Sequence, residues 1–153
     1  MPKVTTLDFA FSHTQFEQDT VITCSNQCVS TKGMFFKAKN TNSNQINISN
    51  LDTSNVSDMS YMFCKCDPLL VSEINVLILN TNNVQDMTYM FGHTSGSNIG
   101  SHISQITIPD NCNCTAMFLG TSADSITLNS WSSYINAEYM FSETRCNYIF
   151  VPF

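Results

Sequence analysis

The chain has few charged residues, and positively charged ones are the scarcest. Asp, Glu, Lys and Arg make up 12% of its 153 residues, and only six of these are Lys or Arg, so the net charge is −6. Phosphate backbones are bound by clustered Lys and Arg, and the sequence has no basic stripe. The composition therefore argues against a nucleic-acid partner. Asn, Ser and Thr carry the polar load, and they favour turns and side-chain-to-backbone hydrogen bonds.

Long apolar runs are also missing. No stretch approaches the ~18 consecutive apolar residues of a membrane span, and the N-terminal segment MPKVTTLDFAFSHTQFEQDT lacks the apolar core of a Sec-type signal peptide. We therefore expect a soluble protein without a membrane span, made in the cytoplasm without a Sec-type leader.

The motifs of common enzyme classes are absent. The sequence has no G-x-S-x-G, H-E-x-x-H or phosphate-binding loop, and no nucleophile or metal-ligand spacing surrounds His13, His93 and His102. We expect these histidines to lie in exposed loops. The sequence thus predicts a protein that is not an enzyme and uses no cofactor.

The seven cysteines are an odd number, which excludes complete disulfide pairing within one chain and favours reduced thiols. Common zinc sites use two matched C-x-x-C pairs. The pairs present here have other spacings: Cys24 with Cys28, Cys64 with Cys66, and Cys112 with Cys114. We therefore expect no metal site, and keep a metal-stabilised, cysteine-containing regulatory module as an alternative function.

What the sequence does contain is an internal repeat. Residues 51–63, LDTSNVSDMSYMF, return 28 residues later as LNTNNVQDMTYMF at 79–91. A Met-Phe pair marks each copy, at steps of 28, 28, 27 and 23: Met34-Phe35, Met62-Phe63, Met90-Phe91, Met117-Phe118 and Met140-Phe141. Self-similarity at this period indicates stacked repeats, with the Met and Phe side chains packed between neighbouring copies.

Within each repeat the apolar period changes from two to about 3.6. Alternating apolar pairs predict short strands at Ile46 and Ile48, Ile74 and Val76, Ile106 and Ile108, Ile126 and Leu128, and Ile149 and Val151. Val56, Met59, Met62 and Phe63 predict a helix of two turns. Four residues before each marker Met stands a residue suited to cap such a helix: Ser30, Asp58, Asp86, Asn113 and Asn136.

These patterns predict an α/β repeat solenoid. It would be a leucine-rich-repeat-like stack of about five short strand-helix repeats over residues 24–153, ending on a strand. Residues 1–23 stand apart from the repeats. We interpret them as an N-terminal cap over the open end of the stack, with a docking arm as the alternative.

The motif L-D-T-S-N-V-x-D-M-S-x-M-F of residues 51–63, with Cys66 three residues after the Phe, resembles the BspA-like leucine-rich repeat of bacterial surface proteins, which also occurs in mycoplasma surface lipoproteins and some parasitic protists. The resemblance is close over residues 46–66 and 74–91 and recognisable over 106–118 and 126–141. It implies a strand-helix solenoid without enzymatic activity, used in adhesion and protein binding.

Two groups of aromatic residues are candidates for binding. Tyr61, Tyr89 and Tyr139 share the slot before the marker Met and would form either an aromatic binding stripe or a half-buried boundary column. Phe9, Phe11 and Phe16 would contact a partner if the N-terminal segment is a docking arm. The apolar C-terminal stretch NYIFVPF could also be covered by a partner, so we consider a homo-oligomer joined through the termini.

The sequence thus predicts a non-enzymatic protein-binding or structural module. We expect a docking or decoration component of a larger assembly, in a phage virion rather than a bacterial envelope complex, and hence located in a virion or at the cell exterior. A bacterial cell-surface adhesin-type module is the first alternative.

Overall fold

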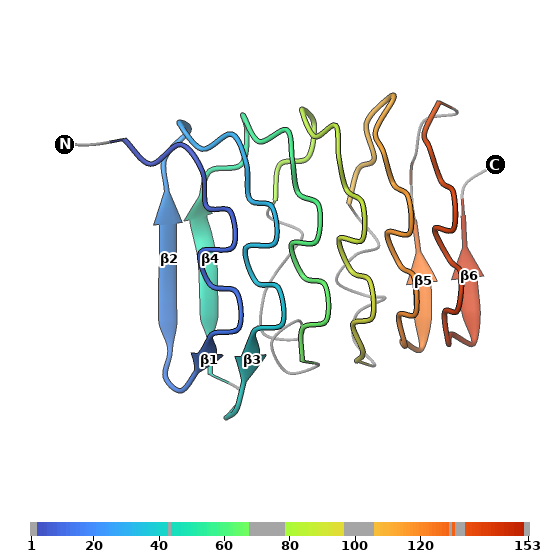
Figure 1. Cartoon of the computed structure of the whole chain (residues 1–153), viewed down its shortest axis with the longest axis horizontal. Helices are drawn as coiled ribbons and strands as arrows, with labels where there is room; N and C mark the ends of the chain where they lie inside the picture. The colour runs from blue at the N-terminus through green and yellow to red at the C-terminus, as the bar shows by residue number, and fades with distance from the viewer. Residues whose placement is uncertain are drawn as a thin grey trace.

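The computed structural model describes residues 3–42, 44–67, 79–96, 106–128, 130 and 134–151. Successive repeats lie side by side in a row, with β2 (Thr20–Cys24) at one end and β6 (Tyr148–Phe150) at the other (Figure 1). The remaining strands are β1 (Gln15–Phe16), β3 (Lys39–Asn40), β4 (Ile46–Leu51) and β5 (Ser125–Thr127). All pairing among them is parallel: β1 with β3, β2 with β4, and β5 with β6.

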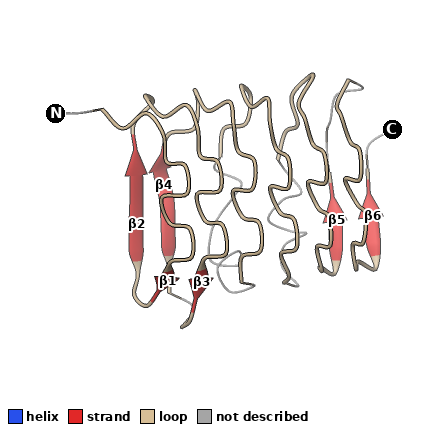
Figure 2. Cartoon of the chain, in the orientation of Figure 1, coloured by secondary structure: helices blue, strands red, loops and turns tan. Residues whose placement is uncertain are grey.

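The predicted strand-helix solenoid is wrong. The described residues contain short strands and turns but no helix (Figure 2). Strands lie at three of the predicted places, 46–48, 126–128 and 149–151, as β4, β5 and β6. Ile106 and Ile108 are buried but belong to no strand, and Ile74 and Val76 lie outside the described residues. Turns occupy each segment for which a helix was predicted.

These turn segments, which we call rungs, are nine residues long and are linked by parallel bridges between equivalent residues. Six rungs lie in the described part of the chain: 6–14, 30–38, 58–66, 86–94, 113–121 and 136–144. Alternate backbone N–H groups donate within the rung, as from Met62 to the Met59 carbonyl at 3.2 Å. The others donate to the next rung, as from Phe63 to the Met90 carbonyl at 2.9 Å. Half of the N–H groups therefore bond between rungs, which a helix would not allow.

Two residues in every rung have left-handed backbone conformations. They stand two residues before and two residues after the rung's Phe, with φ between 54° and 64°. Each is the third residue of a turn closed by an i to i+3 hydrogen bond, as Tyr61 and Lys65 are, and a type II turn requires positive φ there. Most of these residues are not Gly, although positive φ is uncommon in other residues. The bonds between rungs hold them in this conformation.

The five predicted helix caps keep their acceptor role in a different structure. The Asp58 carboxylate accepts from the Ser60 N–H at 2.8 Å and the Asp86 carboxylate from the Thr88 N–H at 2.7 Å. Asn113 and Asn136 bond the second N–H after themselves in the same way, and the Ser30 hydroxyl accepts from the Lys32 N–H at 3.4 Å. These bonds define Asx-type turns, which open the five rungs after the first at their parallel bridges.

The core is a column of rings that runs through all six rungs, with Met thioethers beside it in the five rungs after the first. The rings of Phe35, Phe63, Phe91, Phe118 and Phe141 stack in sequence with centroids 5.5–5.6 Å apart. Met34, Met62, Met90 and Met117 are fully buried beside them. The prediction that the Met and Phe side chains pack between neighbouring copies is therefore confirmed, although the backbone around them is not helical.

Residues 6–14 add a rung that the sequence analysis placed in the cap or arm. Thr6 bridges Ser30, and the N–H groups of Leu7, Phe9 and Phe11 donate to carbonyls of rung 30–38 at 2.8–2.9 Å. Phe11 stacks on Phe35 at 5.7 Å, so it is the first ring of the column. The Met-Phe marker did not reveal this rung because Ala10 stands in the Met position.

In three of the rungs, the residue three places after the marker Phe also makes a buried side-chain bond to the preceding rung. The Thr94 hydroxyl donates to the Phe63 carbonyl at 2.6 Å, and the Cys66 thiol and Thr121 hydroxyl donate likewise to Phe35 and Phe91 at 2.7 Å.

Replacing Thr94 by Val should lower the free energy of unfolding by about 1 kcal/mol, because it keeps the side chain's volume but removes a buried hydrogen bond. The variant Thr94→Cys copies the donor used at Cys66 and should lose less than half as much. Urea unfolding measures both changes, and equal losses would show that the bond contributes nothing.

Candidate functional site

The first left-handed position of each rung carries aromatic residues in four of the six rungs. The residues in this slot are Phe9, Gly33, Tyr61, Tyr89, Ala116 and Tyr139. The rings of Tyr61 and Tyr89 stack in parallel with centroids 5.2 Å apart, and both are half-buried. Burial, and then the neighbouring Tyr89, raise the pKa of Tyr61. Tyr139 is 65% exposed and is separated from this pair by the buried Ala116.

The three N-terminal phenylalanines lie in different environments. Phe9 is 48% exposed, its ring lies over Gly33 and it meets Phe36 edge-on at 6.4 Å. Phe11 stacks on Phe35, and Phe16 is 5% exposed within the core. Phe9 is therefore the member of this trio whose ring is available at the surface.

A second column, which the sequence analysis missed, lies at the other left-handed position. His13, Lys37, Lys65 and His93 occupy it in four successive rungs, and all four are exposed. The Lys37 ammonium lies 5.2 Å from the centre of the Phe36 ring, close enough for a cation–π contact. Aligning the residues two places after each Phe would have revealed this basic column in an otherwise acidic chain.

The cysteines are free thiols, and most are buried. Burial raises the pKa of Cys28 and of Cys64 to about 11, with the neighbouring Cys24 adding to the effect at Cys28. Burial also raises the pKa of Cys66. Cys114 has a raised pKa chiefly because its thiol is hydrogen-bonded to Cys112, whose own pKa is lowered by that bond. Protonated thiols are poor nucleophiles and poor ligands.

No group of three or more His, Cys, Asp or Glu side chains that could hold a metal ion occurs in the part of the chain that the structure describes. The same part of the chain contains no helix able to cross a membrane.

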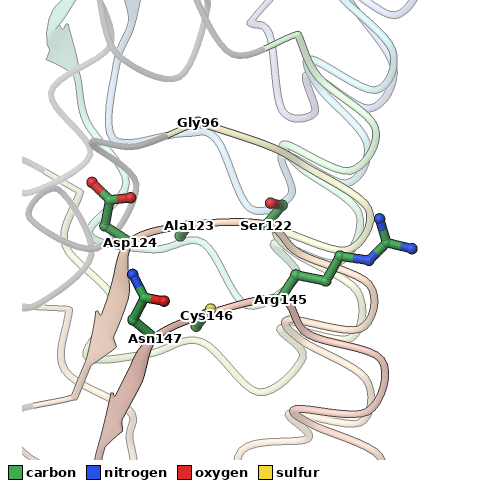
Figure 3. Close-up of a pocket in the computed structure, with 7 residues that line it drawn as sticks. All are labelled: Gly96, Ser122, Ala123, Asp124, Arg145, Cys146 and Asn147. Atoms are coloured by element: carbon green, nitrogen blue, oxygen red, sulfur yellow. The ribbon is translucent and has the colours of Figure 1, made fainter.

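A hollow of about 450 Å³ lies near the C-terminal end of the row, lined by polar and small residues (Figure 3): Gly96, Ser122, Ala123, Asp124, Arg145, Cys146 and Asn147. The Arg145 side chain extends away from Asp124 and Asn147 (Figure 3). Burial raises the pKa of the Cys146 thiol, which disfavours the thiolate. The Arg145 guanidinium could bind a carboxylate or phosphate at this hollow. The residues that line the hollow do not bring a nucleophile and a base together.

Large exposed hydrophobic side chains gather at the two ends of the row. Among the described residues, every such side chain belongs to the first 29 or the last 20 positions. Those near the N-terminus are Val4, Phe9, Val21 and Val29, and those near the C-terminus are Tyr134, Tyr139, Tyr148, Ile149 and Phe150. Exposed apolar surface of this kind marks interaction sites.

The geometry thus defines a repeat protein with an aromatic column, a basic column and two apolar ends. Family comparison agrees with the repeat character: the chain belongs to the family described as "Mycoplasma protein of unknown function, DUF285", which matches residues 1–93 and 29–148. The match is compatible with the BspA-like resemblance, because both relate the chain to repeat proteins of mycoplasmas. No curated protein and no solved structure matches the chain.

Proposed function

We propose that this chain is a non-enzymatic structural module that presents a rigid surface to a protein partner, as a docking or decoration component of a larger assembly. The supporting observation is the aromatic slot. Backbone bonds between rungs hold Tyr61 and Tyr89 in a stacked pair, so little side-chain entropy is left to lose on binding. Tyr also combines a large apolar ring with a hydroxyl that can bond across an interface.

The setting we propose is a virion or the cell exterior. A bacterial cell-surface adhesin-type module is the second candidate. Immunogold electron microscopy of source cells and of particles released from them tests the setting. Label confined to the cell interior would contradict both candidates.

The double variant Tyr61→Ser and Tyr89→Ser should weaken partner binding at least tenfold, since central interface tyrosines commonly contribute about 2 kcal/mol or more. Quantitative cross-linking and capture from source cells measures the loss. Gln85→Ser is the control, because Gln85 is exposed in the middle of the row and lies outside the slot. If the double variant stays folded and captures the same proteins at the wild-type level, the aromatic slot is not the binding surface.

A further inference from the structure

The last described rung has backbone donors that no described residue accepts. In each earlier rung, alternate N–H groups donate to the following rung, as from Ala116 to the Glu138 carbonyl at 2.8 Å and from Phe118 to the Met140 carbonyl at 2.9 Å. The equivalent groups of rung 136–144 donate to no described residue: the N–H groups of Ala137, Tyr139, Phe141 and Glu143.

The first described rung has the matching acceptors. The Ser30, Lys32, Met34 and Phe36 carbonyls receive bonds from rung 6–14. The equivalent carbonyls of rung 6–14 receive none from any described residue: those of Thr6, Asp8, Ala10 and Ser12. Both rungs have nine residues and the same two left-handed positions, so the donors and the acceptors are spaced alike.

The side chains of the two ends also match. Placed against each other in register, the two end rungs would stack Tyr139 on Phe9 and Phe141 on Phe11, as the interior rungs stack Tyr61 on Tyr89 and Phe63 on Phe91. β6, with its exposed Ile149, would lie beside β2, with its exposed Val21, and these two strands occupy opposite ends of the row (Figure 1). The contact would thus cover exposed apolar surface from both ends.

We propose that a second copy of this chain docks on the C-terminal end in the same orientation, so that the N–H groups of rung 136–144 donate to the carbonyls of the second copy's rung 6–14. This rests on the proposed function as an assembly component, and it makes the chain its own partner. A two-fold dimer of C-terminal ends would face donors with donors. The contact is therefore head to tail, and it leaves a free end for each further copy.

One pair opposes the junction. Glu138 would face Asp8 of the second copy, because both stand two residues after their rung's bridge residue. The Asp8 carboxylate accepts from the Ser30 hydroxyl and the Lys32 N–H of its own copy, but two acidic residues in register still repel each other across the junction. The variant Glu138→Gln removes one of the two charges and should therefore strengthen assembly severalfold. If the substitution acted only by loosening the fold, assembly would become weaker instead.

Single-end variants test the direction of assembly. Ile149→Lys places a charge on the C-terminal end and leaves the N-terminal end intact, and Val21→Lys does the reverse. Sedimentation velocity and native mass spectrometry of the full chain, from about 5 to about 500 μM, should show a concentration-dependent ladder of oligomers for the wild type. Each blocked variant alone should be monomeric, and their equimolar mixture should form a heterodimer and nothing larger.

Gln85→Lys is the matched control, because Gln85 is exposed in the middle of the row, and it should assemble like the wild type. Circular dichroism and urea unfolding check that all variants are folded. A wild type that stays monomeric, a blocked variant that still dimerises alone, or a mixture that does not pair would each overturn the proposal. A monomeric wild type that still captures a partner through Tyr61 and Tyr89 would overturn head-to-tail assembly and leave the proposed function standing.

Discussion

Replacing Phe91 by alanine is expected to lower the free energy of unfolding by about 3–5 kcal/mol, the usual cost of removing a buried phenylalanine. Phe91 is fully buried, and its ring stacks on Phe63 at 5.5 Å and on Phe118 at 5.6 Å. Domains are commonly stable by only about 5–15 kcal/mol, so this loss is a large part of the total. Each rung contacts mainly its neighbours, so a cavity here weakens the link between the two halves of the row.

Urea unfolding measures this loss, and Phe141→Ala supplies the control. Phe141 occupies the same slot in the last rung, is half-buried, and stacks on Phe118 alone among the described residues. Its replacement should cost about half as much as that of Phe91, because fewer packing contacts are lost. Equal costs at the two positions would show that the ring column does not stabilise the row through stacking between rungs.

The repeat register and its core were predictable because both depend on side-chain spacing alone. The Met-Phe pairs marked five rungs, and each pair is packed where the register places it, with Phe141 half-buried at the end. The capping residues were also identified correctly as acceptors of backbone N–H groups. What failed was the step from apolar spacing to helix. Two successive turns bring Met59, Met62 and Phe63 to the same inner side as a two-turn helix would, so this spacing does not separate the two structures.

A signal for the turns was present in two glycines. Gly33 stands in the slot of Tyr61, and Gly120 stands in the slot of Lys65. Gly is the residue that most readily adopts positive φ, so one Gly in each of these two slots indicates left-handed positions that the other repeats fill with larger residues. An added Cβ would lie 2.3 Å from the Phe9 ring at Gly33 and 2.4 Å from the His93 ring at Gly120. Glycine therefore also makes room for the side chain of the preceding rung.

The candidate surface was less predictable than the core. The sequence placed Tyr61, Tyr89 and Tyr139 in one slot, and the structure brings the first two together while Ala116 separates the third. Phe16 could not be distinguished from Phe9 by composition, because burial is decided by pairing of β1 with β3. A homo-oligomer joined through the termini was considered from the apolar C-terminal stretch. The complementarity of the ends could not be predicted, since it follows from the direction of the backbone bonds between rungs.

Raising the pH from 9 to 11 under reducing conditions should destabilise the protein by about 2–4 kcal/mol, allowing for partial solvation of the thiolates. Burial raises the pKa of Cys28 and Cys64 from 9.0 to about 11 and raises that of Cys66 as well. A raised pKa means that the unfolded chain loses its thiol protons at lower pH than the folded chain. The stabilisation is therefore complete below pH 9 and is lost as the pH rises towards 11.

Urea unfolding at pH 8, 10 and 11 measures this dependence, with the triple variant Cys28→Ala, Cys64→Ala and Cys66→Ala as control. The triple variant should be less stable than the wild type at pH 8, because small buried side chains are truncated and the Cys66 bond to the Phe35 carbonyl is lost. Its stability should nevertheless change less between pH 8 and pH 11, since the three groups that couple ionisation to unfolding are gone. Ionisation of tyrosine and lysine affects both proteins alike. A triple variant that loses as much stability as the wild type over this range would therefore assign the alkaline sensitivity to those residues and not to the buried thiols.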